Sequence, residues 1–220
     1  MKSALIIGGS GGIGGAIVAK LKARGVETAS LSRADDGFDI TDESSIAAHL
    51  DGIDPLPDLV LVATGALTST RDRPEKQLRD LGPEEPVAQF RLNALGPALV
   101  LKHLRDRIPR DRRFVFAALS ARVGSIGDNG LGGWYSYRTS KAALNSLIHG
   151  AAVEIGRMRR EAVIVCLHPG TVATEFTADY PDHDKVTPAQ AAANLLDTLD
   201  GLGPGDSGGF FDYAGRPIPW

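Results

Sequence analysis

A tyrosine and a lysine four positions apart, Tyr137 and Lys141, form the pair in this sequence best suited to proton transfer. We expect both in a helix over about 134–158, where residues four apart share one face. A phenol with a pKa of about 10 is a poor acid or base at neutral pH. A lysine charge about 5 Å away, at an effective dielectric of about 20, contributes roughly 3 kcal/mol, or a little over two pKa units. The spacing therefore predicts a general acid–base pair, and the alternative is a packing tyrosine beside a surface lysine.

A glycine-rich segment, Gly8-Gly9-Ser10-Gly11-Gly12-Ile13-Gly14-Gly15, joins an apolar run to an amphipathic stretch. Glycines let the backbone turn tightly, and they let a pyrophosphate approach the free N–H groups at the start of a helix. Because the chain has 26 glycines, the spacing alone is weak evidence, and its position between strand and helix carries the argument. A flexible turn is the alternative to a dinucleotide-binding loop. The predicted cofactor contacts of this loop are Gly8, Ser10, Gly12, Ile13 and Gly14.

The second apolar run ends in Ser32-Arg33, with no acidic residue before Asp35. An NAD site usually places a carboxylate at this point to bind the ribose hydroxyl, whereas a 2′-phosphate needs a cation. Ser32 and Arg33 therefore favour NADP as the cofactor over NAD, unless Arg33 is simply a solvated surface arginine. Asp39 and Ile40 follow, and Asp39 could lie beside the adenine amino group or could start a helix.

Short apolar runs alternate with amphipathic stretches along the whole chain. The runs lack the two-residue alternation of a half-exposed sheet, so we expect strands that are covered on both faces. This order predicts an α/β fold of the Rossmann type, a doubly wound parallel sheet with helices on both faces, in one domain over 1–220. The polar segment 67–85 is predicted to be a surface excursion. The expected strands are 4–7, 26–31, 59–63, 114–118, 163–167 and 210–213, and the expected helices are 12–24, 42–50, 84–107, 134–158 and 187–200.

The composition is that of a globular protein, since 43% of the 220 residues are hydrophobic and 23% are charged. The 24 basic and 27 acidic side chains leave a net charge of −3, which argues against nucleic acid and membrane surfaces as partners. Cys166 is the single cysteine, so an internal disulfide is excluded, and its apolar surroundings predict an inert core thiol. No metal site is predicted. No apolar run reaches the roughly 20 residues of a membrane span, and the first residues enter a strand directly, so we expect a cytoplasmic protein.

Several further motifs follow one another along the chain. After the glycine loop and Asp39-Ile40 come Gly65, Asn93, Ser120, the Tyr137/Lys141 pair and the segment 168–174. In this order the motifs resemble the short-chain dehydrogenase/reductase family, and the resemblance covers nearly the whole chain. The segments 132–145 and 215–220 resemble the compact branch of that family, which includes sniffer-type carbonyl reductases and C-factor-like proteins.

The resemblance implies a role for each matching residue. Tyr137 would exchange a proton with the substrate, Lys141 would bind the nicotinamide ribose and lower the tyrosine pKa, and Asn93 would support a water chain to Lys141. Association through the helices 84–107 and 134–158 into a homodimer or homotetramer is also implied. The remaining cofactor contacts would be Ala63 and Gly65 at the adenosine ribose, and Pro169, Gly170, Val172 and Thr174 along the nicotinamide.

The serine that would bind the substrate oxygen is ambiguous. In the family pattern Ser-Ser-x-x-Gly the second serine usually has this role, and anchoring the pattern on Gly124 puts Ala121 in that slot. Ser120 fills the first serine position, and a step of one residue in extended chain turns a side chain to the opposite face. Ser120 is the first candidate, Ser125 is a reserve, and an active site without a serine stays open.

Together these features predict an NADP-dependent oxidoreductase that interconverts a carbonyl group, aldehyde or ketone, and an alcohol by hydride transfer. Its partner would be a small-molecule carbonyl or alcohol substrate. The loops 67–82, 122–133 and 175–186 would form the substrate pocket. Trp134, Phe176 and Tyr180 favour an apolar substrate, and the alternative is that they belong to the core. The alternative is a nucleotide-binding regulatory or signalling protein with little or no turnover.

Overall fold

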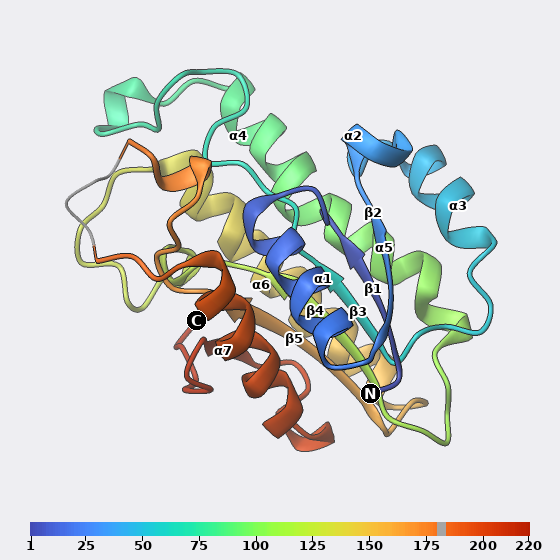
Figure 1. Ribbon diagram of the computed structural model, residues 1–220. Helices are drawn as coiled ribbons and strands as arrows, with labels where there is room; N and C mark the ends of the chain where they lie inside the picture. The colour runs from blue at the N-terminus through green and yellow to red at the C-terminus, as the bar shows by residue number, and fades with distance from the viewer. Residues whose placement is uncertain (180–183) are drawn as a thin grey trace.

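The computed structural model describes residues 1–179 and 184–220, so Tyr180, predicted as a pocket residue, lies outside the described part. Six parallel strands form one sheet in the order β2-β1-β3-β4-β5-β6 (Figure 1). The carboxyl ends of the strands lie at one edge of the sheet, where ligands bind in folds of this type. The strands are β1 Ser3–Ile7, β2 Glu27–Leu31, β3 Leu59–Val62, β4 Phe114–Leu119, β5 Ala162–His168 and β6 Phe210–Asp212.

Helices cover both faces of the sheet. The helices α1 and α7 pack against each other on one face, while α5 and α6 cover the other, with α3 beside α5 and α4 beside α6 (Figure 1). The predicted doubly wound α/β fold is therefore confirmed. The helices are α1 Gly12–Ala23, α2 Arg33–Asp36, α3 Glu43–Asp51, α4 Glu84–Phe90, α5 Gly96–Leu104, α6 Tyr135–Gly156 and α7 Pro188–Gly201.

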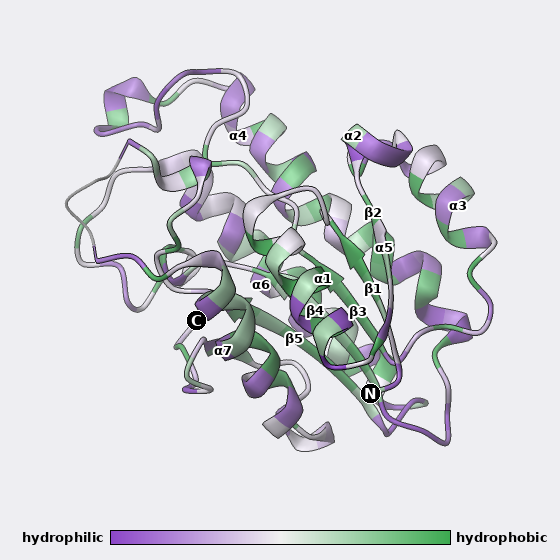
Figure 2. Ribbon diagram, viewed as in Figure 1, coloured by the Kyte–Doolittle hydropathy of each residue, from purple (hydrophilic) through white to green (hydrophobic). Residues whose placement is uncertain are grey.

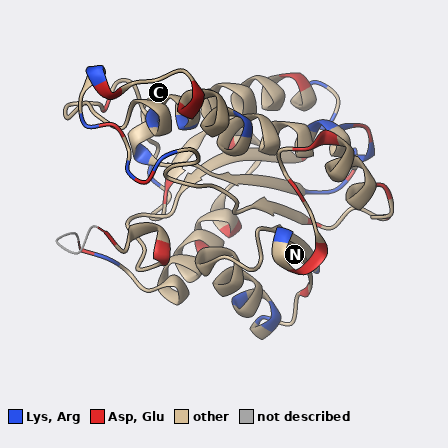
Figure 3. Cartoon of the chain, turned by 90° about the horizontal axis from the view of Figure 1, so that it is seen from above, with Lys and Arg blue, Asp and Glu red and all other residues tan. Residues whose placement is uncertain are grey.

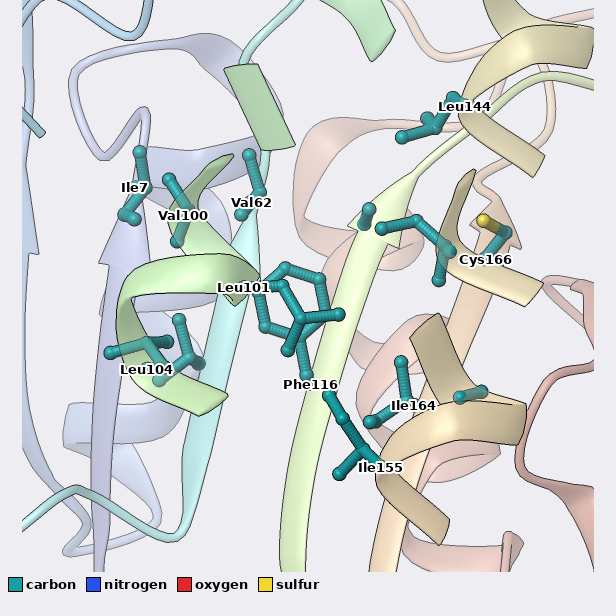
Figure 4. Packing of buried hydrophobic residues seen from close by; sticks show 14 of the residues in the cluster. Ile7, Val62, Val100, Leu101, Leu104, Phe116, Leu144, Ile155, Ile164 and Cys166 are labelled. Carbon is teal, nitrogen blue, oxygen red and sulfur yellow. The ribbon is translucent and has the colours of Figure 1, made fainter. Parts of the chain in front are cut away.

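The two cores alternate along the inner strands, but the expectation of strands covered on both faces is wrong for β2, which lies at the edge of the sheet and is largely exposed. In β1, Leu5 and Ile7 belong to the cluster under α5 and α6, while Ala4 and Ile6 belong to the cluster under α1 and α7. Figure 4 shows the first cluster, in which strand side chains meet those of α5 and α6. Cys166 lies in this cluster, and burial raises the pKa of its thiol to about 12, which agrees with an inert core cysteine. The inner strands β1, β3, β4 and β5 are mostly apolar, whereas the edge strand β2 is not, and polar residues lie on the helices that cover the sheet (Figure 2).

The predicted helix over 84–107 is wrong as one continuous element. The structure divides it into α4, a π-helical turn at Arg91–Leu95, and α5. A π turn holds one more residue than an α turn, and such turns are common at functional sites. The apolar period of the sequence does not reveal a single extra residue, so the break was not foreseen. The short helix α2 was also missed, and Ser32 caps it by accepting a hydrogen bond from the Asp35 N–H group.

Charged side chains of both signs are scattered over the helices and loops, while the strands carry few of them (Figure 3). Within residues 1–179 and 184–220, the structure has no helix that is both long enough and apolar enough to cross a bilayer.

Candidate active site

A cavity of about 1010 Å³ opens at the carboxyl edge of the sheet, between the glycine loop, the end of β2 and the start of α4. Pockets for small molecules and cofactors have volumes of about 300–1,000 Å³, so this one is large enough for a dinucleotide. Two arginines, Arg33 and Arg91, contribute to its wall. Eight of the predicted cofactor residues line the cavity: Gly8, Ser10, Ser32, Arg33, Asp39, Ile40, Ala63 and Gly65.

The glycine loop is packed so closely that a side chain at two of its glycines would collide with neighbouring protein atoms. Such close packing fits the predicted pyrophosphate-binding loop. A Cβ atom added at Gly14 would lie 2.1 Å from the carbonyl oxygen of Gly8, which itself has a φ of +92°. A Cβ added at Gly12 would lie 2.7 Å from Cγ2 of Thr174. The loop therefore abuts the turn after β5, and α1 begins directly behind it. This contact brings the predicted pyrophosphate loop and the predicted nicotinamide turn together.

The turn after β5 carries the other predicted nicotinamide contacts, Pro169, Gly170, Val172 and Thr174. Gly170 has a φ of +79°, and Val172 is buried and forms an isolated parallel bridge with Val186. These residues lie outside the cavity lining, as do Gly12, Ile13 and Gly14. The cavity as lined thus corresponds to the adenosine half of the predicted cofactor site.

Both donors of Ser32 are occupied by acids of α2. Its N–H group donates to Asp36 at 2.8 Å, and its hydroxyl donates to Asp35 at 2.8 Å. The predicted phosphate contact of Ser32 therefore competes with two carboxylates, and Arg33 supplies the positive charge. Asp39 accepts hydrogen bonds from the hydroxyl and the N–H group of Thr41, and these bonds lower the pKa of its carboxyl. Asp39 is thus an ionised acceptor at the cavity wall and not the cap of α3, which is Asp42.

Tyr137 and Lys141 lie together near the start of α6, with the Lys141 Nζ atom 5.8 Å from the centre of the Tyr137 ring. Lys141 also donates a 2.8 Å hydrogen bond to the carbonyl of Leu119, the last residue of β4. Both side chains are buried, and the Tyr137 ring contacts those of Trp134 and Phe176. The helix and the end of β4 thus bring the phenol and the amine into one place.

The predicted lowering of the phenol pKa is wrong for the chain by itself. Burial raises the pKa of Tyr137 well above its usual value, and burial lowers the pKa of Lys141 to about 8. The Coulomb argument from sequence included the charge of the lysine but omitted the loss of solvation, which disfavours the charged form of both groups. Tyr137 is therefore firmly protonated at neutral pH, and Lys141 is mostly protonated.

Asn93 lies in the π turn and ties it to the loop after β3. Its carboxamide accepts from the N–H group of Ala66 and donates to the Ala66 carbonyl, both at 3.0 Å, and it also donates to Gln89 and Ser140. A Cβ atom at Gly65 would lie 3.1 Å from the Asn93 oxygen and 3.4 Å from the Lys141 Nζ atom. The fold thus brings Asn93, Gly65 and Lys141 side by side.

Both candidate serines are buried and hydrogen-bonded within the protein. The Ser120 hydroxyl donates to the Asn145 Oδ1 atom at 2.7 Å, and the Ser125 hydroxyl accepts from the N–H group of Asp128 at 3.1 Å. A hydroxyl has one proton, so Ser120 in this arrangement has none to donate to a substrate. Asn145 lies on the face of α6 that carries Tyr137 and Lys141, one turn after the lysine.

Comparison with known proteins now identifies the family. A family model described as short chain dehydrogenase matches residues 2–185. The chain belongs to the short-chain dehydrogenase family. It is 31% identical to 1-hydroxy-2-glutathionyl-2-methyl-3-butene dehydrogenase of Rhodococcus sp. (strain AD45), over the full length of both chains. It is also 36% identical to C-signal of Myxococcus xanthus, covering 65% of this chain and 83% of that protein.

Solved structures share the fold of this short-chain dehydrogenase. The carbonyl reductase Sniffer of D. melanogaster superimposes with a TM-score of 0.79 at 21% identity, and each chain is covered completely. The NADPH-bound carbonyl reductase from chicken fatty liver has a TM-score of 0.83 at 22% identity, covering 100% of this chain and 94% of that one. A Burkholderia multivorans protein of the short-chain dehydrogenase/reductase type, with bound NADP, has a TM-score of 0.80 at 26% identity, covering 100% and 99%. The protein is therefore an oxidoreductase of the short-chain dehydrogenase/reductase type.

Three buried acids of the described residues were not foreseen from the sequence: Asp212, Glu75 and Glu85. Asp212, at the end of β6, is 1% exposed, and it pairs with Arg216 at 2.8 Å and with Arg122, after β4, at 3.4 Å. Glu75, in the excursion predicted to lie on the surface, is also 1% exposed and contacts the start of α6. Acids within a polar loop or at a strand end look like exposed residues in a sequence, and no local signal marks them as buried.

Proposed function

We propose that this protein is an NADP(H)-dependent oxidoreductase that interconverts a carbonyl compound and an alcohol, with Tyr137 as the general acid–base. The observation that carries the proposal is the meeting of the Tyr137 phenol and the Lys141 amine at the carboxyl edge of the sheet, where Lys141 lies beside Gly65 of the cavity wall. The family membership supports the reaction class. The residues therefore set position and polarity for hydride chemistry rather than providing redox groups themselves.

The residues at the cavity fit NADP(H). Gly12 and Gly14 have no room for a side chain at the start of α1, where a pyrophosphate would approach, and Arg33 offers a cation for the 2′-phosphate. When bound, NADPH would supply the hydride for reduction of the carbonyl carbon. The bound NADP of the Burkholderia multivorans protein supports this choice of cofactor, and NAD is the alternative.

The protonation states of the pair suit the direction of reduction. Tyr137 retains its proton at neutral pH because burial raises its pKa, so it can donate that proton to the oxygen of a carbonyl substrate as negative charge develops there. The ammonium form of Lys141 stabilises the tyrosinate that remains. Asn93, joined to Ala66 and Ser140 beside the lysine, would support the water chain that returns the proton.

Ser120 is our first candidate for binding the substrate oxygen, with Ser125 in reserve. Within the described residues, the amide nitrogen of Asn145 is buried without a hydrogen-bond partner. Turning that amide over would let the nitrogen donate to Ser120 and would release the serine proton for the substrate. Replacing each serine by alanine distinguishes the two candidates. Loss of the serine that binds the substrate oxygen should lower kcat, and loss of the other serine should not.

The substrate class follows from the aromatic rings around Tyr137. The ring of Phe176 is 5.8 Å and that of Trp134 is 6.2 Å from the phenol ring, centre to centre, and Phe176 is 40% exposed. These rings favour an aldehyde or ketone with an apolar body. Its cytoplasmic location and its assembly into a homodimer or homotetramer through α4, α5 and α6 stay predictions.

A nucleotide-binding signalling role with little turnover is the second candidate, favoured by the similarity to C-signal and by the engagement of Ser120 with Asn145. The test is NADPH oxidation with a panel of aldehydes, ketones and diketones, comparing the natural protein with Tyr137→Phe. The enzyme proposal expects turnover that the variant loses while its affinity for NADPH, measured by fluorescence, is kept. Tight NADPH binding without turnover on any substrate would favour the signalling role, and full activity of Tyr137→Phe would refute the role of the tyrosine.

A further inference from the structure

The start of α6 has an unusual backbone. Gly132, Gly133 and Trp134 have φ values of +65°, +64° and +52°, so three successive residues are left-handed, and Trp134 is the one that is not glycine. Trp134 occupies the capping position of α6, but an indole can only donate a hydrogen bond and cannot cap the N–H groups of a helix. The helix must therefore find acceptors for its first turn elsewhere. That turn contains Tyr137.

Glu75 supplies them from the excursion between β3 and α4. Its backbone carbonyl accepts from the N–H group of Trp134 at 2.5 Å, and its carboxylate accepts from the N–H group of Ser136 at 3.3 Å and from the Ser136 hydroxyl. The Glu75 side chain is 1% exposed, and Arg71 lies 3.5 Å from the carboxylate. A negative charge at this end of a helix is favoured by the helix dipole, and α6 has 22 residues.

We propose that Glu75 is a positioning residue for Tyr137, which acts by fixing the first turn of α6 and touches neither substrate nor cofactor. The inference rests on the proposed function, in which Tyr137 donates the proton. Glu75 holds the two residues Trp134 and Ser136, which flank the turn leading to Tyr137, and the Trp134 ring contacts the Tyr137 ring directly. Release of the carboxylate frees Ser136, the residue before Tyr137, while the backbone bond from Trp134 to Glu75 remains, so the first turn of α6 and the phenol on it can shift.

The contacts of Glu75 are separable from the other anchors of the excursion. Glu85 of α4 fixes the start of the excursion by accepting from the N–H groups of Ser69 and Thr70. Asp80 closes its far turn by accepting from the N–H groups of Lys76 and Gln77. Segment 71–77 does not contribute to the lining of the nucleotide cavity. Loss of the Glu75 carboxylate therefore affects the first turn of α6 more than the cofactor site.

The test is a graded set of variants with both a kinetic and a binding measurement. Glu75→Ala removes both carboxylate bonds, whereas Glu75→Gln keeps an acceptor for the Ser136 N–H group, and Ser136→Ala removes the hydroxyl bond alone. We expect Glu75→Ala to lower kcat about 10- to 100-fold, as small misplacements of catalytic groups do, with the dissociation constant of NADPH within about twofold of the natural value. Glu75→Gln should restore most of the loss, and Asp80→Ala should leave kcat near the natural value.

Three results would overturn the proposal. One is a natural kcat in Glu75→Ala while Tyr137→Phe is inactive. Another is an equal loss of kcat and NADPH affinity that glutamine does not restore, since this indicates general loss of structure. If the alanine variant does not fold, Ser136→Ala decides: it lacks one of the two carboxylate bonds, so a natural kcat in that variant would refute the proposal. Activity in Tyr137→Phe, by contrast, would refute the proposed function itself, so the two failures are distinct.

Discussion

The buried ammonium group of Lys141 should make the protein less stable than a variant without it. Lys141 is 3% exposed, and burial lowers its pKa from 10.5 to about 8. One pKa unit corresponds to about 1.4 kcal/mol, so the shift amounts to roughly 3 kcal/mol against folding at pH 7. Removing the 2.8 Å bond from Nζ leaves the Leu119 carbonyl unpaired and offsets about 1–2 kcal/mol of this gain. We therefore expect Lys141→Met to raise the free energy of unfolding at pH 7 by about 1–2 kcal/mol, while reductase activity is lost.

The stability that Lys141→Met gains over the natural protein should decrease as the pH rises. Between about pH 8 and 10.5 the unfolded chain keeps the lysine proton that the folded chain has already lost, so the stability of the natural protein rises with pH across this window. The variant lacks this titration, and groups that do not interact with Lys141 contribute equally to both proteins. The thiol of Cys166, which does interact with Lys141, stays protonated in this pH range because burial raises its pKa to about 12. The stability of the variant minus that of the natural protein should therefore be constant below about pH 8 and should fall by roughly 3 kcal/mol as the pH approaches 10.5. Because this difference is only about 1–2 kcal/mol at pH 7, it should change sign within this window.

The assay is urea unfolding of both proteins at pH 7, 8, 9 and 10 and constant ionic strength, followed by far-ultraviolet circular dichroism. Lys20→Met, at an exposed position of α1, is the matched control and should show little difference at any pH. A variant less stable than the natural protein at pH 7, or a stability difference that does not change with pH, would refute the reasoning. Either result would mean that the amine is better solvated than its burial indicates.

Three further predictions concern the nucleotide site. Arg33→Ala should weaken NADPH binding about tenfold and NADH binding less than about twofold, because in the proposed site the guanidinium would pair with the 2′-phosphate that NADH lacks. Fluorescence titration with both nucleotides measures this. Changing Asp35 and Asp36 together to serine should tighten NADPH binding about threefold or more, because the change frees the two hydrogen-bond donors of Ser32. The effect should be greatest at low salt, and an unchanged ratio of NADPH to NADH affinity would contradict the prediction. Gly14→Ala should abolish nucleotide binding and lower the melting temperature, because its Cβ would lie 2.1 Å from the Gly8 carbonyl oxygen. If calorimetry showed that the variant binds NADPH with the natural affinity, the glycine loop would not be the pyrophosphate-binding site.

Those parts of the site that depend on neighbouring residues in the chain were predictable. The glycine loop follows β1 and precedes α1, and the local geometry of a strand, a tight turn and a helix start does not depend on the rest of the fold. The same holds for Tyr137 and Lys141, which share a face of α6 because the helical period is local. The apolar runs predicted the strands for a similar reason, since a strand buried on both faces needs no polar residue.

Those parts of the site that depend on contacts between distant segments of the chain could not be predicted from the sequence. The sequence predicted the charge of Lys141 near Tyr137, but the sign of the net pKa effect on the phenol depends on burial, and burial is decided by β4, α4 and the loops that close over the helix. The hydrogen bond from Ser120 to Asn145 joins residues 25 positions apart, so no local pattern could specify which way the hydroxyl turns.

The amino-acid sequence by itself determined the alternation of strands and helices, the glycine loop and the spacing of the phenol and amine, because each follows from backbone sterics or from the period of one element. Tertiary structure alone decided the π turn that carries Asn93, the burial of Glu75 against the start of α6, and the protonation state of the catalytic pair. These features depend on desolvation and on hydrogen bonds between segments far apart in the chain, and such free energies exist only after the segments have packed together.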